Sequence, residues 1–552
     1  MREKRKELHW GRLLDCYVER PANVNEMLDR SIERSPDATA VVDGDRRVTY
    51  RELDRMATNL AANLHSRGVR PSERVAVMLG NQLEAIVAIV GIARVGAILI
   101  PIGARLRRPE ISWIFEDATP IAVIHGPTFA AEMPDEGPAR DMRFVVGGPA
   151  WDALLDDVTQ PEQREERGSR SEPSTRSQRM ERGEDDTYGI LYTSGTTGRP
   201  KGAMLAHLNV VHSCLHWEDA HALVRGERTV LCVPWSHVAG LCGVVLPFLH
   251  LGATLVLLND FKASTFLRLA RDEKITHALM VPAMYGLCLL EPDLASYELD
   301  DWRLGAYGGA SMPVPTIERF AREFPKLKMC NAYGATETTS PATIMPPGDG
   351  VAHAESIGKT VPCGDIRVVD DAGRELPRGE EGELWIAGPM IVPGYWRNES
   401  ASASSFVGGY WKSGDIGAID AEGYVRIADR KKDMINRGGF KVYPAEVESV
   451  LAGLPGVIEA AVIGESDSLM GESVAAFLNV KPDSVDEQAV RDWCATRMAD
   501  YKIPARIVIA NAPLPRNANG KIQKADLRAL VRTLPPLLRY GRSTSGTASG
   551  QA

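Results

Sequence analysis

The amino-acid sequence predicts an α/β protein with a large N-terminal domain of mainly parallel sheets flanked by helices, a β-rich subdomain and a small C-terminal α/β domain. Three observations predict this class. Strand-like and helix-like segments alternate from residue 46 onward, residues 355–428 form short β-rich pieces separated by turns, and a second α/β pattern begins after residue 434. Repeated strand–helix units favour parallel sheets covered by helices.

The first strand–helix units lie between residues 46 and 100. Residues 46–50 (RRVTY) predict a strand, and apolar residues then recur at helical spacing until Gly68. Residues 74–79 (RVAVML) predict a second strand, which precedes a helix over 83–95 and the strand-like AILI. The same alternation returns at 229–233, 238–250, 253–258, 264–273 and 277–281. We therefore expect residues 1–428 to form one large domain.

The remaining chain predicts a smaller domain over residues 434–537. Its elements are a helix beginning at Pro444, strands near 458–463 and 474–480, and a helix over roughly 485–498. Two polar segments, residues 160–186 and the tail 538–552, hold too little large apolar surface to offset the entropy lost on ordering. We interpret the first as a surface linker or disordered insertion and the second as a disordered tail.

The charge balance argues against bulk nucleic-acid binding, because 64 Lys and Arg against 73 Asp and Glu give a net charge of −9. Eight cysteines without a CxxC pair disfavour a disulfide framework and a zinc knuckle, so we expect a reducing, cytoplasmic location. Residues 85–104 and 231–258 are apolar but interrupted by Gly, Pro, His or Arg. A spanning helix needs about 20 apolar residues, so we expect no membrane span.

Residues 192–202, YTSGTTGRPKG, predict a phosphate-binding loop. The glycines let backbone N–H groups turn inward, the hydroxyls add donors, and the lysine adds a cation. The stretch is not a Walker loop, because Pro200 and Gly202 flank the lysine where that loop has Gly and Ser or Thr. The candidate ATP contacts are Thr193, Ser194, Gly195, Thr196, Thr197, Gly198 and Lys201.

This loop and six further motifs occur in an order that resembles the adenylate-forming (AMP-binding) superfamily, which includes acyl-CoA synthetases, adenylation domains and luciferases. The six motifs are AYGGASMP (306–313), NAYGATET (331–338), GELWIAGPMIVPGYW (382–396), YWKSGDIG (410–417), DRKKDMINRGGFKVYP (429–444) and PRNANGKI (515–522). The resemblance covers roughly residues 25–530. It implies attack of a carboxylate on the α-phosphorus of ATP, with Mg²⁺ as cofactor and coenzyme A as co-substrate.

The resemblance also assigns residues to the adenylation site, where charge neutralisation and positioning carry most of the catalysis. Glu337 matches the magnesium ligand and Thr336 the residue that hydrogen-bonds the α-phosphate. Asp415 matches the residue that holds the ribose, and Arg430 matches a second ribose or phosphate contact. The residues that match the adenine-binding segments are Gly308, Gly309, Ala310, Asn331 and Tyr333.

The second half-reaction involves the C-terminal domain, which the resemblance makes mobile. Lys521 matches the catalytic lysine of adenylation, and residues 429–433 match the hinge, with Lys432 as its pivot. The swivel would bring the CoA-binding residues Gly438, Gly439 and Phe440 to the site. Relatives often carry lysine where this chain has Gly438 and glutamine where it has Lys441, which leaves the helper contacts open.

The acid pocket is expected to take a carboxylic acid without an α-amine. Amino-acid adenylation domains place an aspartate in the segment equivalent to 234–241 (PWSHVAGL), where this chain has no acidic residue. An uncompensated ammonium would be costly there. The expected pocket residues are Trp235, His237, Val238, Gly308, Ala332, Gly334 and Thr338. Several are small, so medium-chain fatty, alicyclic and aryl acids all fit.

For two sets of histidines, the sequence allows both a functional and a purely structural interpretation. His237 resembles the gate between the acid pocket and the CoA channel, and the alternative is a satisfied core histidine. His212 and His216 are four residues apart on an expected helix, but HSCLH lacks the glutamate of HExxH. We expect this second pair to serve helix packing.

Taken together, the motifs predict an acid:CoA ligase that forms an acyl-AMP and transfers the acyl group to CoA. The alternative is a stand-alone adenylating enzyme that loads a separate carrier protein. A catalytically dead nucleotide-binding protein is disfavoured by the intact Lys521, Glu337, Thr336 and Asp415. The oligomeric state, with a homodimer as one option, stays open.

Overall fold

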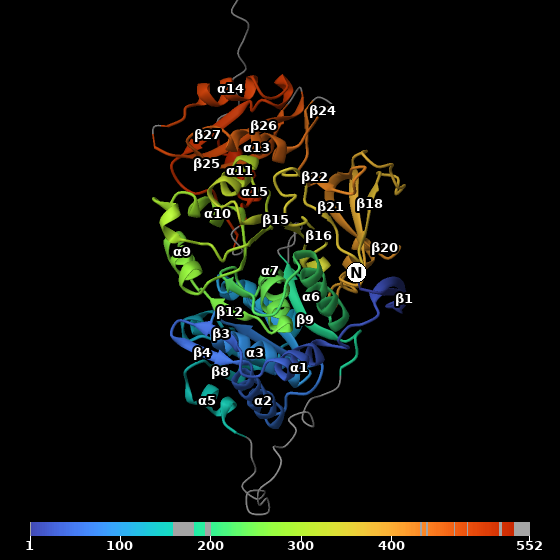
Figure 1. Ribbon diagram of the computed structural model, residues 1–552. Coiled ribbons are helices and arrows are strands. Elements are labelled where there is room, and N and C mark those ends of the chain that lie inside the picture. The colour runs from blue at the N-terminus through green and yellow to red at the C-terminus, as the bar shows by residue number, and fades with distance from the viewer. Residues whose placement is uncertain are drawn as a thin grey trace, which may run out of the picture. The chain divides into compact units, whose positions relative to one another are not determined.

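The structure is a computed structural model that describes residues 2–157, 182–193, 200–430, 433–437, 440–467, 470–482, 484–517 and 521–534. The chain divides into two compact units, Met1–Ala428 and Asp429–Ala552. The predicted α/β class is confirmed: parallel sheets lie between helices in the large unit, which also carries a β-rich part, and the small unit is α/β (Figure 1).

A six-stranded sheet forms the first part of the large unit. Its strands, in spatial order, are β10 (Lys201–Ala206), β9 (Thr187–Thr193), β6 (Ile98–Pro101), β5 (Arg74–Met78), β7 (Ala122–His125) and β8 (Arg143–Val145). All neighbours pair in parallel except β10 and β9, which form an antiparallel pair. Apolar residues of α2 (Tyr50–Ser66) and α3 (Leu83–Arg94) cover one face and those of α4 (Arg108–Ala118) the other. Strands buried on both faces explain the continuous apolar runs in the sequence.

A nine-stranded sheet forms the second part. Its order is β17 (Lys359–Thr360), β16 (Thr343–Ile344), β15 (Lys328–Tyr333), β14 (Leu304–Tyr307), β13 (His277–Met280), β11 (Arg228–Leu231), β12 (Thr254–Leu257), β3 (Thr39–Asp43) and β4 (Arg46–Thr49). The strands from β15 to β3 are parallel, and the outer ones pair antiparallel.

Helices cover both faces of this sheet, as the alternation of burial along each strand requires. Val230 and Ala278 face one core, with α9 (Ala263–Asp272), α10 (Pro282–Cys288) and α11 (Val314–Glu323). Their neighbours Leu231 and Leu279 face the other, with α1 (Val24–Arg34), α6 (His207–His221) and α8 (Leu246–Leu251). The sheet therefore has only its edges and strand ends open to ligands.

The segment expected as one helix over 238–250 is divided into three pieces. These are α7 (Val238–Gly240), a π-helical turn η5 (Leu241–Val245) and α8. The backbone N–H of Leu246 donates to the carbonyl of Leu241, five residues earlier. Pro247 in the first turn of α8 lacks an N–H and cannot continue an unbroken helix, which accounts for the break.

The β-rich part is a five-stranded antiparallel sheet. Its strands are β18 (Asp365–Val369), β19 (Gly382–Ala387), β21 (Tyr410–Ile419), β20 (Phe406–Val407) and β22 (Val425–Arg430), with β22 paired to β21. Two short helices elsewhere in the unit are α5 (Pro149–Leu155) and α12 (Glu399–Ser405).

An N-terminal hairpin, β1 (Lys4–His9) and β2 (Arg12–Tyr17), precedes the first predicted strand and was not expected from the sequence. The buried Arg20 anchors it, donating to both carboxylate oxygens of Glu7 at 3.0 and 2.6 Å and to those of Glu184 at 2.6 and 2.8 Å. Residues 182–186 of the predicted linker 160–186 thus take part in packing, while 158–181 lie outside the described residues, as does the tail 538–552.

The small unit is a five-stranded sheet with three helices. The strands are β24 (Phe440–Val442), β23 (Ile435–Arg437), β26 (Gly471–Val480), β25 (Val457–Asp467) and β27 (Arg506–Ala510). The helices are α13 (Pro444–Ala452), α14 (Glu487–Ala495) and α15 (Lys524–Val531). α13 and α14 pack on one face and α15 on the other, so the unit has its own apolar core.

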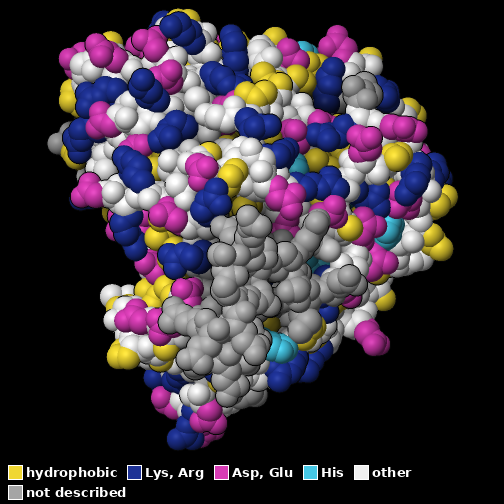
Figure 2. Space-filling view, turned by 60° about the horizontal axis from the view of Figure 1, so that its bottom comes forward, with side chains coloured by type: hydrophobic (Ala, Val, Ile, Leu, Met, Phe, Trp, Pro, Cys, Tyr) yellow, Lys and Arg dark blue, Asp and Glu magenta, His cyan; other side chains and the backbone are white. Residues whose placement is uncertain are grey.

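Among the helices of the described residues, none combines the length and hydropathy that crossing a bilayer requires. All eight cysteines are buried with free thiols. On the face drawn in Figure 2, Lys and Arg side chains are interspersed with Asp and Glu over the described surface.

Acid should loosen the N-terminal hairpin, because the hydrogen bond from Arg20 lowers the pKa of the Glu7 carboxyl from 4.5 to about 2. The stabilisation is complete above pH 4.5 and is lost as the pH falls toward 2. Glu7→Gln should remove about 1 kcal/mol or more of hairpin stability at neutral pH and flatten this acid dependence. Hydrogen exchange of residues 4–17 measures both. Asp15→Asn, at the exposed Lys6–Asp15 pair, is the control and should change little.

Candidate active site

The ends of two neighbouring parallel strands form the centre of the candidate site. Tyr307 of β14 lies opposite Asn331 of β15, so the segments that follow both strands leave the same edge of the sheet. The backbones are very close there: a Cβ atom on Gly308 would lie 2.3 Å from the carbonyl oxygen of Ala332. The missing side chain lets the two backbones approach each other, which brings together the segments after β14 and β15 that are predicted to bind adenine.

Tyr333 and Asp415, 82 residues apart, are joined directly. The Tyr333 phenol donates to Asp415 Oδ2 at 2.5 Å and links β15 of the nine-stranded sheet to β21 of the β-rich sheet. Asp415 is only 3% exposed, and its own backbone N–H donates to Ser413 Oγ at 3.0 Å. The carboxylate predicted to hold the ribose is therefore fixed beside the strand end predicted to hold the base.

The tight turn after β15 presents Thr336 and Glu337. The turn η7 (Thr336–Thr338) begins beyond Gly334, where a Cβ atom would come within 2.9 Å of Thr338 Oγ1. The buried Thr338 hydroxyl accepts from the Ala335 N–H at 2.8 Å and donates to the Ala335 carbonyl at 3.1 Å. Thr338 thus shapes the loop with its hydroxyl, while Thr336 and Glu337 stay half-buried at its surface.

Glu337 belongs to a short polar chain that the sequence motifs only partly indicated. The Tyr395 phenol donates to Glu337 Oε1 at 2.8 Å, and Lys201 Nζ lies 5.1 Å from the centroid of the Tyr395 ring. Burial and the Glu337 charge raise the pKa of Tyr395 above its usual range, so the phenol remains a donor. Tyr395 lies in the quoted motif GELWIAGPMIVPGYW, but nothing in the pattern assigned it a partner.

The two ends of the predicted phosphate-binding loop lie next to the contacts that join Glu337, Tyr395 and Lys201. Thr193 of β9 pairs with Lys201 of β10, and Ala203 of β10 forms a bridge with Tyr395. The Trp396 N–H donates to the Gly202 carbonyl at 2.7 Å. The predicted loop residues Ser194, Gly195, Thr196, Thr197 and Gly198 lie outside the described residues.

Glu337 fits the expected Mg²⁺, because a half-buried carboxylate that a phenol orients offers the hard oxygen that this ion prefers. Lys201 on the same phenol would face the phosphates that accompany the ion. The arrangement is suited to binding an anionic ligand together with a divalent cation.

The segment predicted to line the acid pocket follows β11, which is parallel to β13, β14 and β15 in the same sheet. It therefore lies along the same edge as the segments predicted to bind adenine. Trp235 is 1% exposed, donating from its N–H to Asn81 Oδ1 at 3.0 Å and from Nε1 to the Leu79 carbonyl at 2.8 Å. These contacts make Trp235 an anchor of the segment.

His237 is half-buried and begins α7, with Nδ1 accepting from the Ala239 N–H at 3.2 Å. Because Nδ1 accepts, the proton of the neutral ring is on Nε2. Val238 beside it is 3% exposed. A hydrogen bond within the segment thus holds His237, and the π-helical turn η5 follows directly.

Two predicted residues of the small unit, Lys521 and Phe440, are described by the structure and belong to separate segments. Lys521 is exposed, its N–H donates to Asn517 Oδ1 at 2.9 Å, and the Asn517 N–H donates to the Lys521 carbonyl at 2.8 Å. Phe440 begins β24 and is 54% exposed. Lys432, Gly438 and Gly439 lie outside the described residues, and of Arg430 only the backbone, in β22, is described.

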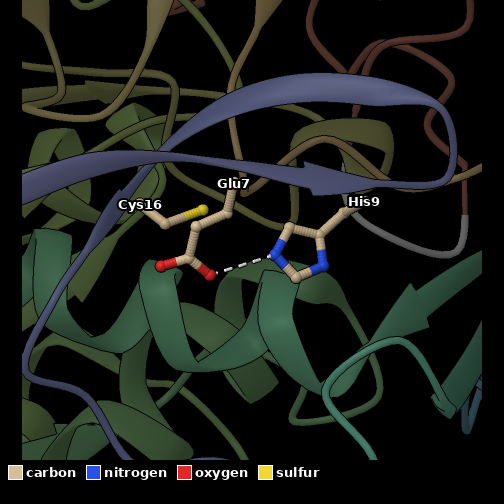
Figure 3. Close-up of side chains that lie close together, drawn as sticks. All are labelled: Glu7, His9 and Cys16. Atoms are coloured by element: carbon tan, nitrogen blue, oxygen red, sulfur yellow. Dashed lines mark hydrogen bonds and ion pairs between the residues drawn. The ribbon is translucent and has the colours of Figure 1, made fainter.

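One three-residue group among the described residues has ligand atoms close enough for a metal ion. Glu7, His9 and Cys16 of the N-terminal hairpin lie within 4.8 Å of one another, with Glu7 and His9 pointing toward each other (Figure 3). Arg20 already occupies both Glu7 oxygens, and burial raises the pKa of the Cys16 thiol to about 12. A fixed cation and a protonated thiol oppose metal binding, so we interpret the group as structural.

The histidine pair of α6, His212 and His216, also has structural contacts. His212 Nε2 accepts from the Tyr17 N–H at 3.2 Å, and Nδ1 lies 3.0 Å from the Leu208 carbonyl, which can only accept. Both ring nitrogens are therefore bound to backbone. His216 is fully buried, and its ring packs against those of His212 and Tyr17.

Comparisons with known proteins agree with this geometry. Residues 28–396 match the AMP-binding enzyme family, and residues 446–521 match the AMP-binding enzyme C-terminal domain. The chain is 34% identical over 512 residues to the long-chain-fatty-acid–CoA ligase FadD13 of Mycobacterium tuberculosis, covering 92% of this chain and 98% of that one. It is 34% identical over 503 residues to a feruloyl-CoA synthase of Amycolatopsis sp, covering 90% and 97%.

A solved structure shows the same architecture. The ATP-bound crystal structure of MatB from Rhodopseudomonas palustris matches with a TM-score of 0.82 and 30% identity, over 93% of this chain and 99% of that chain. The similarity therefore extends through both compact units.

Removing the Tyr395 hydroxyl should weaken MgATP binding. In Tyr395→Phe, Glu337 loses a donor at 2.8 Å, and we expect the dissociation constant of MgATP to rise about tenfold. Titration calorimetry measures the change. Tyr410→Phe is the matched control, because Tyr410 also donates to a carboxylate, Asp365, on the exposed part of the β-rich sheet. An equal loss in both variants would contradict a specific role for Tyr395.

Proposed function

Because this chain belongs to the AMP-binding enzyme family and is an acid–thiol ligase, we propose that it activates a carboxylic acid lacking an α-amine with ATP and passes the acyl group to CoA. The observation that carries the proposal is the arrangement around one sheet edge. There the Gly308–Ala332 approach, the Tyr333–Asp415 pair and the Glu337–Tyr395–Lys201 chain offer places for base, ribose and phosphates.

In the first half-reaction a carboxylate oxygen attacks the α-phosphorus of ATP and pyrophosphate leaves, which gives an acyl-adenylate with AMP as a good leaving group. Lys201 and Thr336 lower the charge repulsion and orient the phosphates. Glu337 would hold Mg²⁺, which supplies Lewis-acid neutralisation of phosphate charge when bound. Tyr395 orients Glu337 without neutralising it. Asp415, held by Tyr333, fixes the ribose.

In the second half-reaction the CoA thiol replaces AMP at the acyl carbon. We assign Lys521 to adenylation and the segment of Gly438, Gly439 and Phe440 to CoA, with Lys432 as the pivot between them. Lys521 is exposed and its backbone is held by Asn517, which supports a role at the surface of the small unit. Phe440 is likewise exposed within its unit.

The acid is proposed to be a medium-chain fatty, alicyclic or aryl acid. The relatives support acids of more than one class, because one is named a long-chain-fatty-acid–CoA ligase and another a feruloyl-CoA synthase at the same identity. The segment 234–241 has no carboxylate to pair with an ammonium. Half-buried His237 stands at the start of α7, where it could separate the acid from the thiol channel.

Mass spectrometry of one reaction with ATP, Mg²⁺, CoA and a pool of fatty, aryl and alicyclic acids tests the proposal. We expect an acyl-CoA whose mass identifies the acid, together with AMP and pyrophosphate. The same reaction without CoA should stop at the acyl-adenylate. Acyl-adenylate that persists in the presence of CoA would instead favour a separate carrier protein as the acceptor. Absence of both products from the whole pool would contradict the proposed substrate range.

Lys521→Ala should lower adenylation, measured as acid-dependent ATP–pyrophosphate exchange, by on the order of 10²-fold. ATP binding should stay within about twofold, since the nucleotide contacts belong to the large unit. Lys524→Ala is the control, because Lys524 Nζ is paired with Glu448 Oε1 at 2.8 Å within the small unit. A variant that keeps full exchange activity would remove Lys521 from the mechanism.

A further inference from the structure

An exposed aromatic side chain marks the end of the small unit's first hairpin. β23 and β24 pair with Arg437 opposite Phe440, the two described residues that flank the expected CoA-binding glycines. Phe440 is 54% exposed, although its neighbour in the strand pairing, Arg437, is half-buried. A large apolar side chain in water gains a fixed orientation only through a neighbour that supports it.

That neighbour is Tyr501. The Phe440 and Tyr501 rings are stacked, with centroids 4.6 Å apart and an angle of 22° between their planes. Arg437 Nη1 also donates to the Tyr501 carbonyl at 2.6 Å. One residue therefore contacts both sides of the hairpin end, by its ring on the β24 side and by its backbone on the β23 side.

Tyr501 is itself held in place by the body of the small unit. It lies in the turn η8 (Asp500–Lys502) and packs against the core formed with α13 and α14. Lys502 Nζ pairs with Glu446 Oε1 at 2.5 Å. Arg491 donates to the carbonyls of Pro504 and Ala505 at 2.9 and 3.0 Å. The platform under Phe440 is thus fixed from α13 and α14.

We infer that Tyr501 is a positioning residue for acyl transfer to the thiol, acting through Phe440 on the hairpin that receives the pantetheine arm. The inference rests on the proposed function, since it assigns that hairpin to the second half-reaction. The proposed function assigns the hairpin to thioester formation and not to adenylation, so the Tyr501 ring should matter for one half-reaction only. The phenol hydroxyl is not part of the stack, so phenylalanine should replace tyrosine.

The test compares Tyr501→Ala and Tyr501→Phe with the unaltered enzyme in two assays. For Tyr501→Ala we expect ATP–pyrophosphate exchange within about twofold and kcat/KM for CoA lowered about tenfold, the loss expected from one aromatic contact. Tyr501→Phe should keep both activities within about twofold. An equal loss in both assays, unchanged thioester formation in Tyr501→Ala, or failure of phenylalanine to restore it would each overturn the inference.

A second readout does not depend on turnover. Hydrogen exchange of the peptide over residues 433–443 should become about tenfold faster in Tyr501→Ala, with residues 457–480 unchanged. Trp493→Ala is the matched control, because this aromatic of the same unit packs against Arg497 and donates from Nε1 to the Val450 carbonyl. An unaltered enzyme that forms adenylate but no acyl-CoA would refute the proposed acceptor. Unchanged exchange of 433–443 would refute the role of Tyr501.

Discussion

The candidate site depends on one backbone constraint, the parallel run of β11, β13, β14 and β15 with every strand ending at the same edge. Segments that are distant in sequence meet at this edge because parallel pairing places the carboxyl end of each strand there. The close contact between Gly308 and Ala332 is one result of this constraint, since any side chain at residue 308 would collide with a carbonyl oxygen. The six-stranded and β-rich sheets then each contribute one polar partner, Lys201 through β10 and Asp415 through β21.

Carboxylates in this protein are held in two ways, one in the candidate site and the other in the N-terminal hairpin. Glu337 and Asp415 each accept a hydrogen bond from a tyrosine hydroxyl, a donor that carries no charge of its own. Glu7, in contrast, is held by the guanidinium of Arg20, which neutralises it and lowers its pKa. A carboxylate that must attract a cation or accept from ribose hydroxyls cannot be paired in the second way.

Much of the fold was accessible from the sequence, because buried parallel strands such as β5 and β6 appear as continuous apolar runs and α2 shows regular helical spacing. The N-terminal hairpin was not, since KRKELH and RLLDCY carry little alternation and are stabilised by the distant Leu208 and by Glu184, which Arg20 joins to Glu7. Motif residues were predictable because whole motifs identify them. Tyr395 was not, because its role follows from a contact with Glu337, 58 residues away, that no local pattern encodes.

In the small unit, the segments proposed for the two half-reactions are held by different contacts. The Lys521 turn is closed by its own hydrogen bonds to Asn517, whereas the Arg437–Phe440 hairpin end is supported by Tyr501. These anchors share no residue, so a change in one should leave the energetics of the other nearly intact. If the small unit presents these two segments in succession, as we propose, each must be held by contacts of its own. Local anchoring of each segment is therefore what the proposed alternation would require.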